Sequence, residues 1–313
     1  MSKLLSSPLA TATLSRSPQL ASRWRTGLGK LSNQTWLGLV PVIAYLGLFY
    51  LVPLVYLLLA SFRTTTGVGL EFAPDWTLAH YQEFFTQASN WIAYRRSLTI
   101  AGCTVLFSIL CAYPLAYTIT FIVPQRYRQL LLLLIIAPFW TSFIIRAFAW
   151  QLLLSQGGLL NSGLAWLHLP RLTILNTHVA TTLGFTLFGT LLITLSLCSV
   201  MSAIPANLLA AAANLGAKQG QTFYHVILPL TLPGMVTGAL LTFIITLGDY
   251  VVPTLLGGGV RTVLAQMMVG AMTTHFNVPR AATYAMVILV TILAVAIPLL
   301  HWAGRNPMRE EAL

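Results

Sequence analysis

The stretch LLAAAANLGAKQGQTFYHVILPL, residues 208–230, separates two long apolar runs and carries one formal charge, on Lys218. Its first half is rich in alanine, the residue with the highest helix propensity. Pro205 suits the first position of a helix, and Gly216 can adopt the left-handed conformation that ends one. The pattern therefore predicts a helix over 206–215 that stops at a glycine.

The second half of this stretch predicts another short helix, over 218–228. We expect it to stop at Pro229, because proline lacks the N–H that a helix interior requires. Alanine side chains are too small to form a core within such a projection. A helix lying flat on the bilayer would carry several basic residues, and here only Lys218 is present. The two helices are therefore expected to dock against another surface.

The rest of the chain has the composition of a multi-pass membrane protein. Of its 313 residues, 57% are hydrophobic and 7% are charged, and a soluble core cannot hide apolar runs longer than about 18 residues. We expect an all-α membrane protein with six membrane-spanning helices. The expected spans cover residues 37–62, 98–123, 130–154, 179–200, 232–256 and 283–302.

The distribution of lysine and arginine predicts the orientation of these spans. With the N-terminus inside, ten basic residues fall in inner segments and six in outer loops. The inner set is Lys3, Arg16, Arg23, Arg25, Lys30, Arg126, Arg128, Lys218, Arg305 and Arg309. The outer set is Arg63, Arg95, Arg96, Arg171, Arg261 and Arg280. This bias favours a cytoplasmic N-terminus, and the net charge of +11 indicates contact with anionic headgroups of the bilayer rather than with nucleic acid.

The two ends of the chain are expected to lie outside the membrane domain, which covers 35–304. Residues 1–34 contain no acid and are rich in Ser, Thr, Leu and Arg, as in a disordered cytoplasmic tail. An organelle transit peptide has the same composition, which leaves an organelle membrane as the alternative to the bacterial inner membrane. Residues 305–313 are expected to form a second cytoplasmic tail.

Two outer loops are expected to contain short helices. The loop over 63–97 includes FAPDWTLAHYQEFF, whose alternating aromatic and polar residues predict an amphipathic helix at the membrane interface. The alternative is an ordered loop that packs on the outer helix ends. The loop over 155–178 has the glycine and asparagine content of a re-entrant or surface helix. The expected interfacial anchors are Trp76, Tyr81, Phe84 and Phe85.

The opening stretch also resembles a known family. AAANLGA followed by QTFYHVILPLTLPG is similar to the cytoplasmic loop of the permease subunits of binding-protein-dependent ABC importers. The pattern of that family is Glu-Ala-Ala, three residues, Gly, and later an Ile-x-Leu-Pro segment. The matching residues are Ala211, Ala212, Gly216, Ile227, Leu228 and Pro229. Ala210 stands at the position of the family's Glu, so the resemblance implies that one electrostatic contact of this loop is absent.

Four further segments resemble the spermidine/putrescine-type branch of this family. They are WTLAHYQEFF (76–85), YPLAYTIT (113–120), APFWTSFIIRAFAWQLLLSQGGLLN (137–161) and GDYVVPTLLGGG (248–259). Relatives that transport opines, phosphonates and other small solutes share these motifs. The resemblance therefore implies import of a polyamine or a related small organic compound.

The resemblance also implies partners. In this family the loop over 205–229 is a coupling helix that docks in a cleft of a separate ATPase, which binds ATP and Mg and drives alternating access. Ala217 and Lys218 belong to the same docking segment. A second permease, identical or different, and a soluble substrate-binding protein complete such importers. The chain itself is then a transport subunit rather than an enzyme, with no cofactor of its own.

Two charged residues, Arg146 and Asp249, lie inside expected spans, where ionisable groups are rare and functional. Counted from the inner helix ends, both lie at a depth of roughly 25 Å, so they are placed to meet. One interpretation is a structural ion pair between the third and fifth spans. The other is that one or both line the translocation path.

Small and polar residues form helical stripes on two spans. On the fifth span the stripe is Gly234, Gly238, Thr242, Thr246 and Asp249. On the fourth span it is Thr182, Thr186, Thr190, Thr194 and Cys198. Close helix packing through small residues and two walls of a water-accessible path are equally compatible with this pattern.

The sequence also excludes several functions. It has no GxxxxGK[ST] motif and no HExxH motif, so it predicts neither a nucleotide-binding P-loop nor a zinc protease. The three cysteines fall inside expected spans, which indicates neither a disulfide framework nor a metal site. A self-sufficient ion-coupled carrier remains the main alternative, although such carriers usually have internal repeats and several embedded acids. A membrane enzyme would need a convergent nucleophile and base, which the sequence does not suggest.

Overall fold

The computed structural model describes residues 33–65, 72–259 and 262–304, most of which lie in helices. Two units are distinguished, residues 1–56 and residues 57–313. The expected tails fall outside the described residues, except that Asn33 and Gln34 begin the first helix. In the first unit, helix α2 (Asn33–Leu46) is followed by one π-helical segment (Gly47–Leu51) and by the start of α3 (Val52–Ala60).

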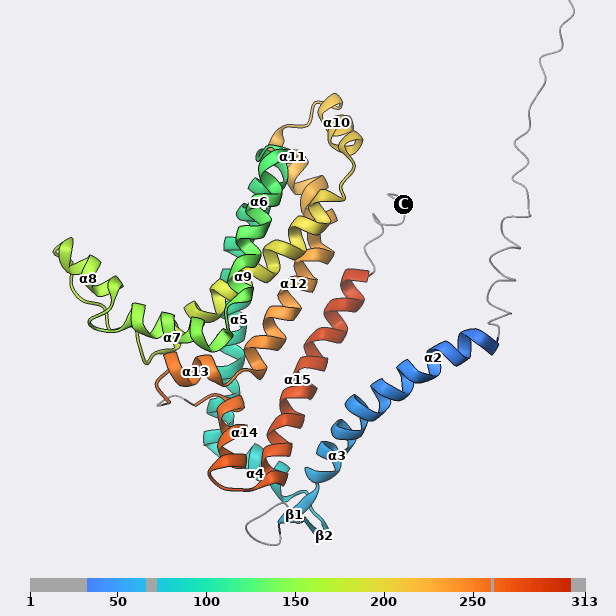
Figure 1. The fold of residues 1–313 in the computed structure, drawn as a ribbon, viewed down its shortest axis with the longest axis vertical. Helices are drawn as coiled ribbons and strands as arrows, with labels where there is room; N and C mark the ends of the chain where they lie inside the picture. The colour runs from blue at the N-terminus through green and yellow to red at the C-terminus, as the bar shows by residue number, and fades with distance from the viewer. Residues whose placement is uncertain (1–32, 66–71, 260–261, 305–313) are drawn as a thin grey trace, which may run out of the picture. The chain divides into compact units, whose positions relative to one another are not determined.

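The second unit is a helical bundle with one short β-hairpin (Figure 1). Its longer elements are α5 (Ala88–Tyr117), α6 (Gln125–Ile136), α7 (Phe143–Leu154), α9 (His178–Ser202), α12 (Leu228–Gly248), α14 (Leu264–Thr273) and α15 (Val278–Gly304). Its shorter elements are β1 (Arg63–Thr65), β2 (Phe72–Trp76), α4 (Ala79–Thr86), α8 (Leu159–Trp166), α10 (Ala206–Asn214), α11 (Gln219–Thr222) and α13 (Val251–Leu256). Helices α10 and α11 lie at one end of the unit, and the hairpin and α4 lie at the other (Figure 1).

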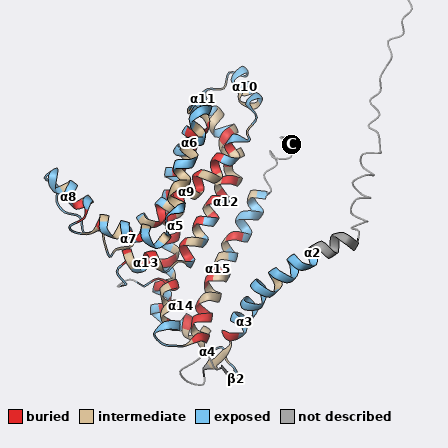
Figure 2. Cartoon of the chain, in the orientation of Figure 1, coloured by how far each residue is buried: buried red, intermediate tan, exposed pale blue. Residues whose placement is uncertain are grey.

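Helices α5, α9 and α12 form the core of the second unit, where buried residues concentrate (Figure 2). Glycines allow this close approach. A Cβ on Gly189 would lie 2.5 Å from the Ser108 hydroxyl and from a methyl group of Thr242. A Cβ on Gly238 would lie 2.9 Å from the Cα of Ile193. Small residues therefore hold the three helices together, as they do in many membrane bundles.

Six segments are long and apolar enough to cross a membrane, as predicted. They are Val40–Ala60, Ala88–Ile122, Phe143–Trp166, His178–Ser202, Gln219–Gly248 and Val278–Gly304. The expected third span, 130–154, is not one continuous helix. A 3-10 turn (Ala137–Trp140) and an extended Thr141 interrupt it, and α7 begins only at Phe143. Pro138 lies in this turn, and its ring disfavours a continuous α-helix.

The outer loop contains more structure than predicted. Strands β1 and β2 pair antiparallel, so the described chain is not purely α-helical. The expected helix is present as α4, but Phe84 is 2% exposed and packs against Tyr94 and Tyr284 rather than at an interface. Trp76 is well exposed. The loop therefore packs on the helix ends, the alternative that the sequence left open.

Candidate functional site

Helix α10 ends as the sequence predicts, at a left-handed glycine. Gly216 has a φ of +78°. Its N–H donates to the carbonyl of Ala213 at 2.9 Å, and the N–H of Ala217 donates to that of Ala212 at 3.1 Å. These two bonds form a Schellman motif, which satisfies carbonyls at the helix end. A residue with a Cβ is strained at this φ, although the space around Gly216 is open.

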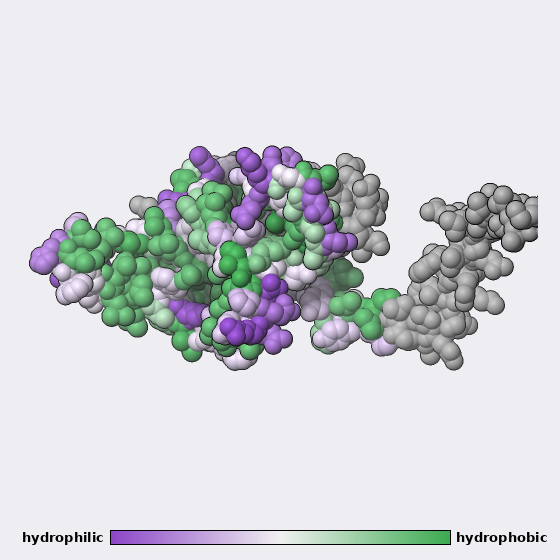
Figure 3. All heavy atoms as spheres, turned by 90° about the horizontal axis from the view of Figure 1, so that it is seen from above, coloured by the Kyte–Doolittle hydropathy of each residue, from purple (hydrophilic) through white to green (hydrophobic). Residues whose placement is uncertain are grey.

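Helix α10 has no buried residue, although it is rich in alanine. Ala210 and Ala211 are exposed, Ala212 and Ala217 are half-buried, and Leu215 beyond the helix is 88% exposed. Viewed from this end of the unit, hydrophilic and hydrophobic residues lie side by side (Figure 3). The exposed alanines and Leu215 therefore leave apolar side chains accessible at this end.

The second half of the loop differs from its prediction. Lys218 precedes α11, and its N–H donates to the Gln221 side chain at 2.8 Å. Helix α11 then runs through a π-helical segment (Phe223–Ile227) directly into α12, so the expected stop at Pro229 is wrong. The wider π-helical turn rearranges the hydrogen bonds just before the proline, which lies in the first turn of α12, where a missing N–H is tolerated.

Because α11 continues into α12, the loop has exposed residues at its start and residues packed on the bundle at its end. Lys218 is exposed, whereas Ile227 is 4% exposed, and Leu228 and Pro229 are half-buried. The three apolar residues at the motif's end therefore pack on the bundle, and a docking role for them stays a prediction.

An aromatic cluster links the loop to α5. The Phe223 ring meets the rings of Tyr113 and Tyr117 edge-on, with centroids 5.5 and 6.0 Å apart. The Tyr113 hydroxyl shares a 3.0 Å hydrogen bond with the hydroxyl of Thr231 on α12. Sequence reasoning missed this cluster, although the spacing of the two tyrosines indicates a single face of α5. Phe223 and Tyr113 therefore connect the loop to both α5 and α12.

Arg146 lies in α7 among aromatic rings. Its guanidinium carbon is 5.1 Å from the ring centroid of Phe188, 5.6 Å from that of Phe143 and 5.8 Å from that of Phe139. The π faces of these rings stabilise the cation. Its Nε is buried and has no hydrogen-bond partner among the described residues, and the side chain borders a cavity of about 290 Å³ that Trp150 also lines.

Asp249 has another role than pairing with Arg146. Its carboxylate accepts hydrogen bonds from the backbone N–H groups of Val251 (2.9 Å) and Val252 (3.1 Å). It thereby caps α13, which begins where the fifth span was expected to continue to residue 256. Within the described residues the one ion pair is elsewhere, so the Arg146–Asp249 pair does not form in this structure. A path-lining role for either residue stays a prediction.

The threonine stripes are packed between helices. Thr190, Thr242 and Thr246 are each at most 8% exposed. Their hydroxyls donate to backbone carbonyls one turn earlier, at 2.7 to 2.9 Å. This is the packing interpretation of the stripe. Thr186 is also buried, and it borders a groove between α5 and α9. That the two stripes line a water-accessible path stays a prediction.

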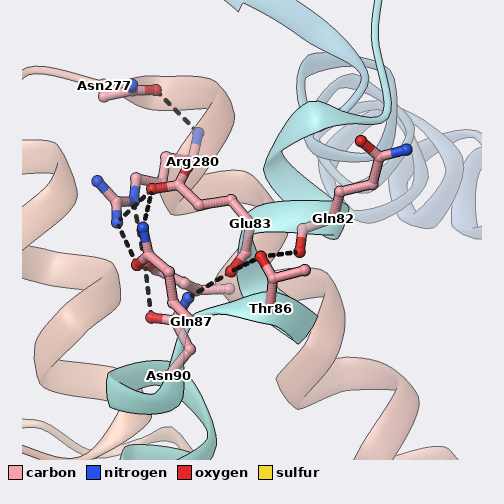
Figure 4. A network of polar contacts seen from close by, with 8 residues as sticks. Gln82, Glu83, Thr86, Gln87, Asn90, Asn277 and Arg280 are labelled. Carbon is pink, nitrogen blue, oxygen red and sulfur yellow. Dashed lines mark hydrogen bonds and ion pairs between the residues drawn. The ribbon is translucent and has the colours of Figure 1, made fainter.

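The opposite end of the unit is held by a polar network (Figure 4). Arg280 on α15 pairs with Glu83 on α4 at 3.0 Å and donates to the Tyr284 hydroxyl at 3.0 Å. The Asn90 amide donates to the backbone carbonyl of Glu83, and its oxygen accepts from Tyr284. Gln87 donates to the Glu83 carboxylate at 2.7 Å. Sequence reasoning counted Arg280 only as an outer charge.

Comparisons with known proteins agree with a bundle of membrane-spanning helices. Residues 105–302 match the model of the family described as binding-protein-dependent transport system inner membrane component. The chain is 32% identical over 294 residues to the inner membrane ABC transporter permease protein YdcU of Escherichia coli, covering 87% of this chain and 93% of that one. It is 34% identical over 219 residues to the spermidine/putrescine transport system permease protein PotB of Haemophilus influenzae, covering 69% and 76%.

Solved structures show the same fold. A bacterial ABC transporter that imports the acidic polysaccharide alginate has a TM-score of 0.69 at 18% identity, covering 92% of this chain and 99% of that chain. The methionine ABC transporter MetNI in an inward-facing conformation has a TM-score of 0.53 at 17% identity, covering 69% and 96%.

Proposed function

We propose that the cargo of this chain is a polyamine, given that the chain is a permease subunit of an ABC importer. It belongs to the family described as binding-protein-dependent transport system inner membrane component. Spermidine and putrescine are the expected solutes, or a related small organic compound. The observation that carries this proposal is the 34% identity to PotB of Haemophilus influenzae over 69% of the chain.

We further propose that a separate ATPase docks on the loop over 205–229. Support comes from the exposed α10, the exposed Leu215 and the continuity of α11 with α12. ATP and Mg are bound and ATP is hydrolysed by that partner. Because Ala210 replaces the family's Glu, docking relies on apolar contact, as when an amphipathic helix enters a groove. A second permease and a soluble substrate-binding protein complete the importer, and the N-terminus is cytoplasmic.

Uptake measurements test the cargo. Cells that express the complete importer should accumulate labelled putrescine or spermidine only when ATP is available. Unlabelled polyamines should compete with this uptake, whereas opines and phosphonates should not. Competition by the latter compounds alone would reject the polyamine proposal while leaving the importer role intact. Uptake by the purified chain in liposomes without ATP would instead favour an ion-coupled carrier.

Affinity purification tests the docking site. Gly216→Pro imposes a φ near −65° where the native value is +78°, and therefore disrupts the end of α10. The wild-type chain should retain an ATPase in mild detergent, and the variant should lose it. Gly220→Ala is the matched control, because Gly220 lies in the same loop with open space around it and no left-handed φ. Equal retention by both variants would reject docking at this loop.

A further inference from the structure

A groove of about 760 Å³ runs between α5 and α9. It belongs to two membrane-spanning segments and is separate from the coupling loop and from Arg146. Its middle is apolar and is formed by residues such as Ile100, Phe107 and Leu183. Arg95 and Arg96 line the end of the groove that lies near the start of α5. The groove is thus cationic at one end and mostly apolar along its length, with Thr99, Thr182 and Thr186 also in its lining.

The two arginines lack an anionic partner within the described residues. Arg95 is exposed and Arg96 is half-buried. The one ion pair within 4 Å in the described part of the chain joins Arg280 to Glu83, so neither groove guanidinium has a carboxylate. Both arginines also lie on the side predicted to be outer, where the positive-inside rule disfavours basic residues. An anion from outside the chain could therefore pair with these two arginines.

The dimensions of the groove suit an amphiphile rather than a soluble anion. Trp91 lies one helical turn before Arg95 on α5 and is exposed, and tryptophan gathers at the membrane–water interface. The groove continues along α5 to Cys111, which is roughly 24 Å of helix beyond Arg95. It therefore extends from the level of the lipid headgroups into the hydrocarbon region.

We propose that this groove binds an anionic phospholipid, with its phosphate at Arg95 and Arg96 and an acyl chain along Phe107 and Leu183. Guanidinium groups bind phosphate through two parallel hydrogen bonds, which lysine does not provide. A polyamine would be repelled by the two arginines. A small soluble anion would leave the apolar length of the groove uncovered.

Native mass spectrometry of the complete importer tests the headgroup contact. The purified wild-type complex should retain phosphatidylglycerol and release phosphatidylcholine. In Arg95→Gln/Arg96→Gln the preference for phosphatidylglycerol should fall about 30-fold, because each basic group near a lipid surface contributes roughly a fivefold factor in affinity. Arg126→Gln/Arg171→Gln removes the same charge from exposed positions outside the groove and should keep the preference. Equal losses in both double variants would overturn the proposal.

Cysteine alkylation locates the acyl chain. Cys103 and Cys111 line the groove, whereas Cys198 is buried elsewhere and serves as the internal reference. In detergent, added phosphatidylglycerol should slow the reaction of Cys103 and Cys111 with N-ethylmaleimide more than phosphatidylcholine does, and Arg95→Gln/Arg96→Gln should abolish this difference. Equal protection by both lipids would overturn the proposal. So would protection of the assembled complex without any lipid, because a neighbouring chain would then fill the groove.

Discussion

The two ends of the second unit are built in opposite ways. At the hairpin end, which carries β1, β2 and α4, Arg280, Glu83 and Asn90 connect α4 to α15 through an ion pair and side-chain hydrogen bonds. At the loop end, α10 has no buried residue and Leu215 is almost fully exposed. The first end joins its helices through polar contacts, although His80 Nδ1 has no hydrogen-bond partner among the described residues, whereas the second leaves apolar side chains exposed. Stability should therefore depend on the hairpin end, and the proposed coupling to an ATPase should depend on the loop.

The largest effect is expected from Phe223→Ala, which removes the ring that joins the loop to Tyr113 and Tyr117. Two aromatic contacts contribute together about 1–3 kcal/mol, so ATP-driven uptake should fall at least about fivefold. The ATPase should still co-purify, because its docking surface is unchanged. Uptake per molecule of complex measures this effect.

Phe121→Ala provides the control, because Phe121 contacts Tyr117 at 5.2 Å but makes no ring contact with Phe223. Its uptake should fall much less. Equal losses in the two variants would show that packing of α5, rather than the link to the loop, limits transport.

A smaller effect is expected from Arg280→Gln at the hairpin end. The ion pair is partly exposed, with side chains 29% and 33% accessible, so it contributes little by itself. With the lost hydrogen bond to Tyr284, the destabilisation should be about 1–2 kcal/mol. Thermal unfolding in detergent should show a lower Tm, while retention of the ATPase stays normal.

Arg171→Gln is the matched control, since Arg171 is exposed and has no ion-pair partner within the described residues. A lower Tm in both variants would contradict the proposed difference between the two ends. Loss of the ATPase in Arg280→Gln would contradict it as well.

The smallest effect is expected from pH, which changes the stability of the hairpin end through His80. Burial lowers the pKa of His80 below its ordinary value of 6.5; the Arg280 charge lowers it further, and Glu83 opposes the shift. The unfolded chain therefore binds the proton more readily than the folded chain, so stability falls as pH drops through 6.5 toward the lower folded pKa. The wild-type Tm should decrease slightly between about pH 7.5 and about pH 5.5. His80→Gln should show a smaller decrease, and an equal or larger one would contradict the assignment.

Sequence reasoning predicted the features that depend on composition and local conformation. Long apolar runs gave six spans, and the left-handed Gly216 gave the end of α10. It did not predict the interruption before α7 or the passage of α11 into α12. At Pro138 and Pro229 the cost of a missing N–H depends on the turn in which the proline lies.

Contacts between helices were harder to predict. An ion pair between Arg146 and Asp249 was one of two interpretations, because their depths are similar, but depth gives no information about which way a helix face points. In the structure Arg146 contacts phenylalanine rings and Asp249 caps α13. The burial of Phe84 was missed for a related reason, since an aromatic residue in an amphipathic pattern suits both an interface and a core.

Photo-crosslinking at the loop tests the central claim most directly. A benzoylphenylalanine at Leu215, which is 88% exposed, should crosslink to the ATPase in native membranes. The same residue at Leu159 on α8, which is 78% exposed, should give no ATPase product. Crosslinks to the ATPase from Leu159 and none from Leu215 would contradict the assignment of the loop as the coupling site.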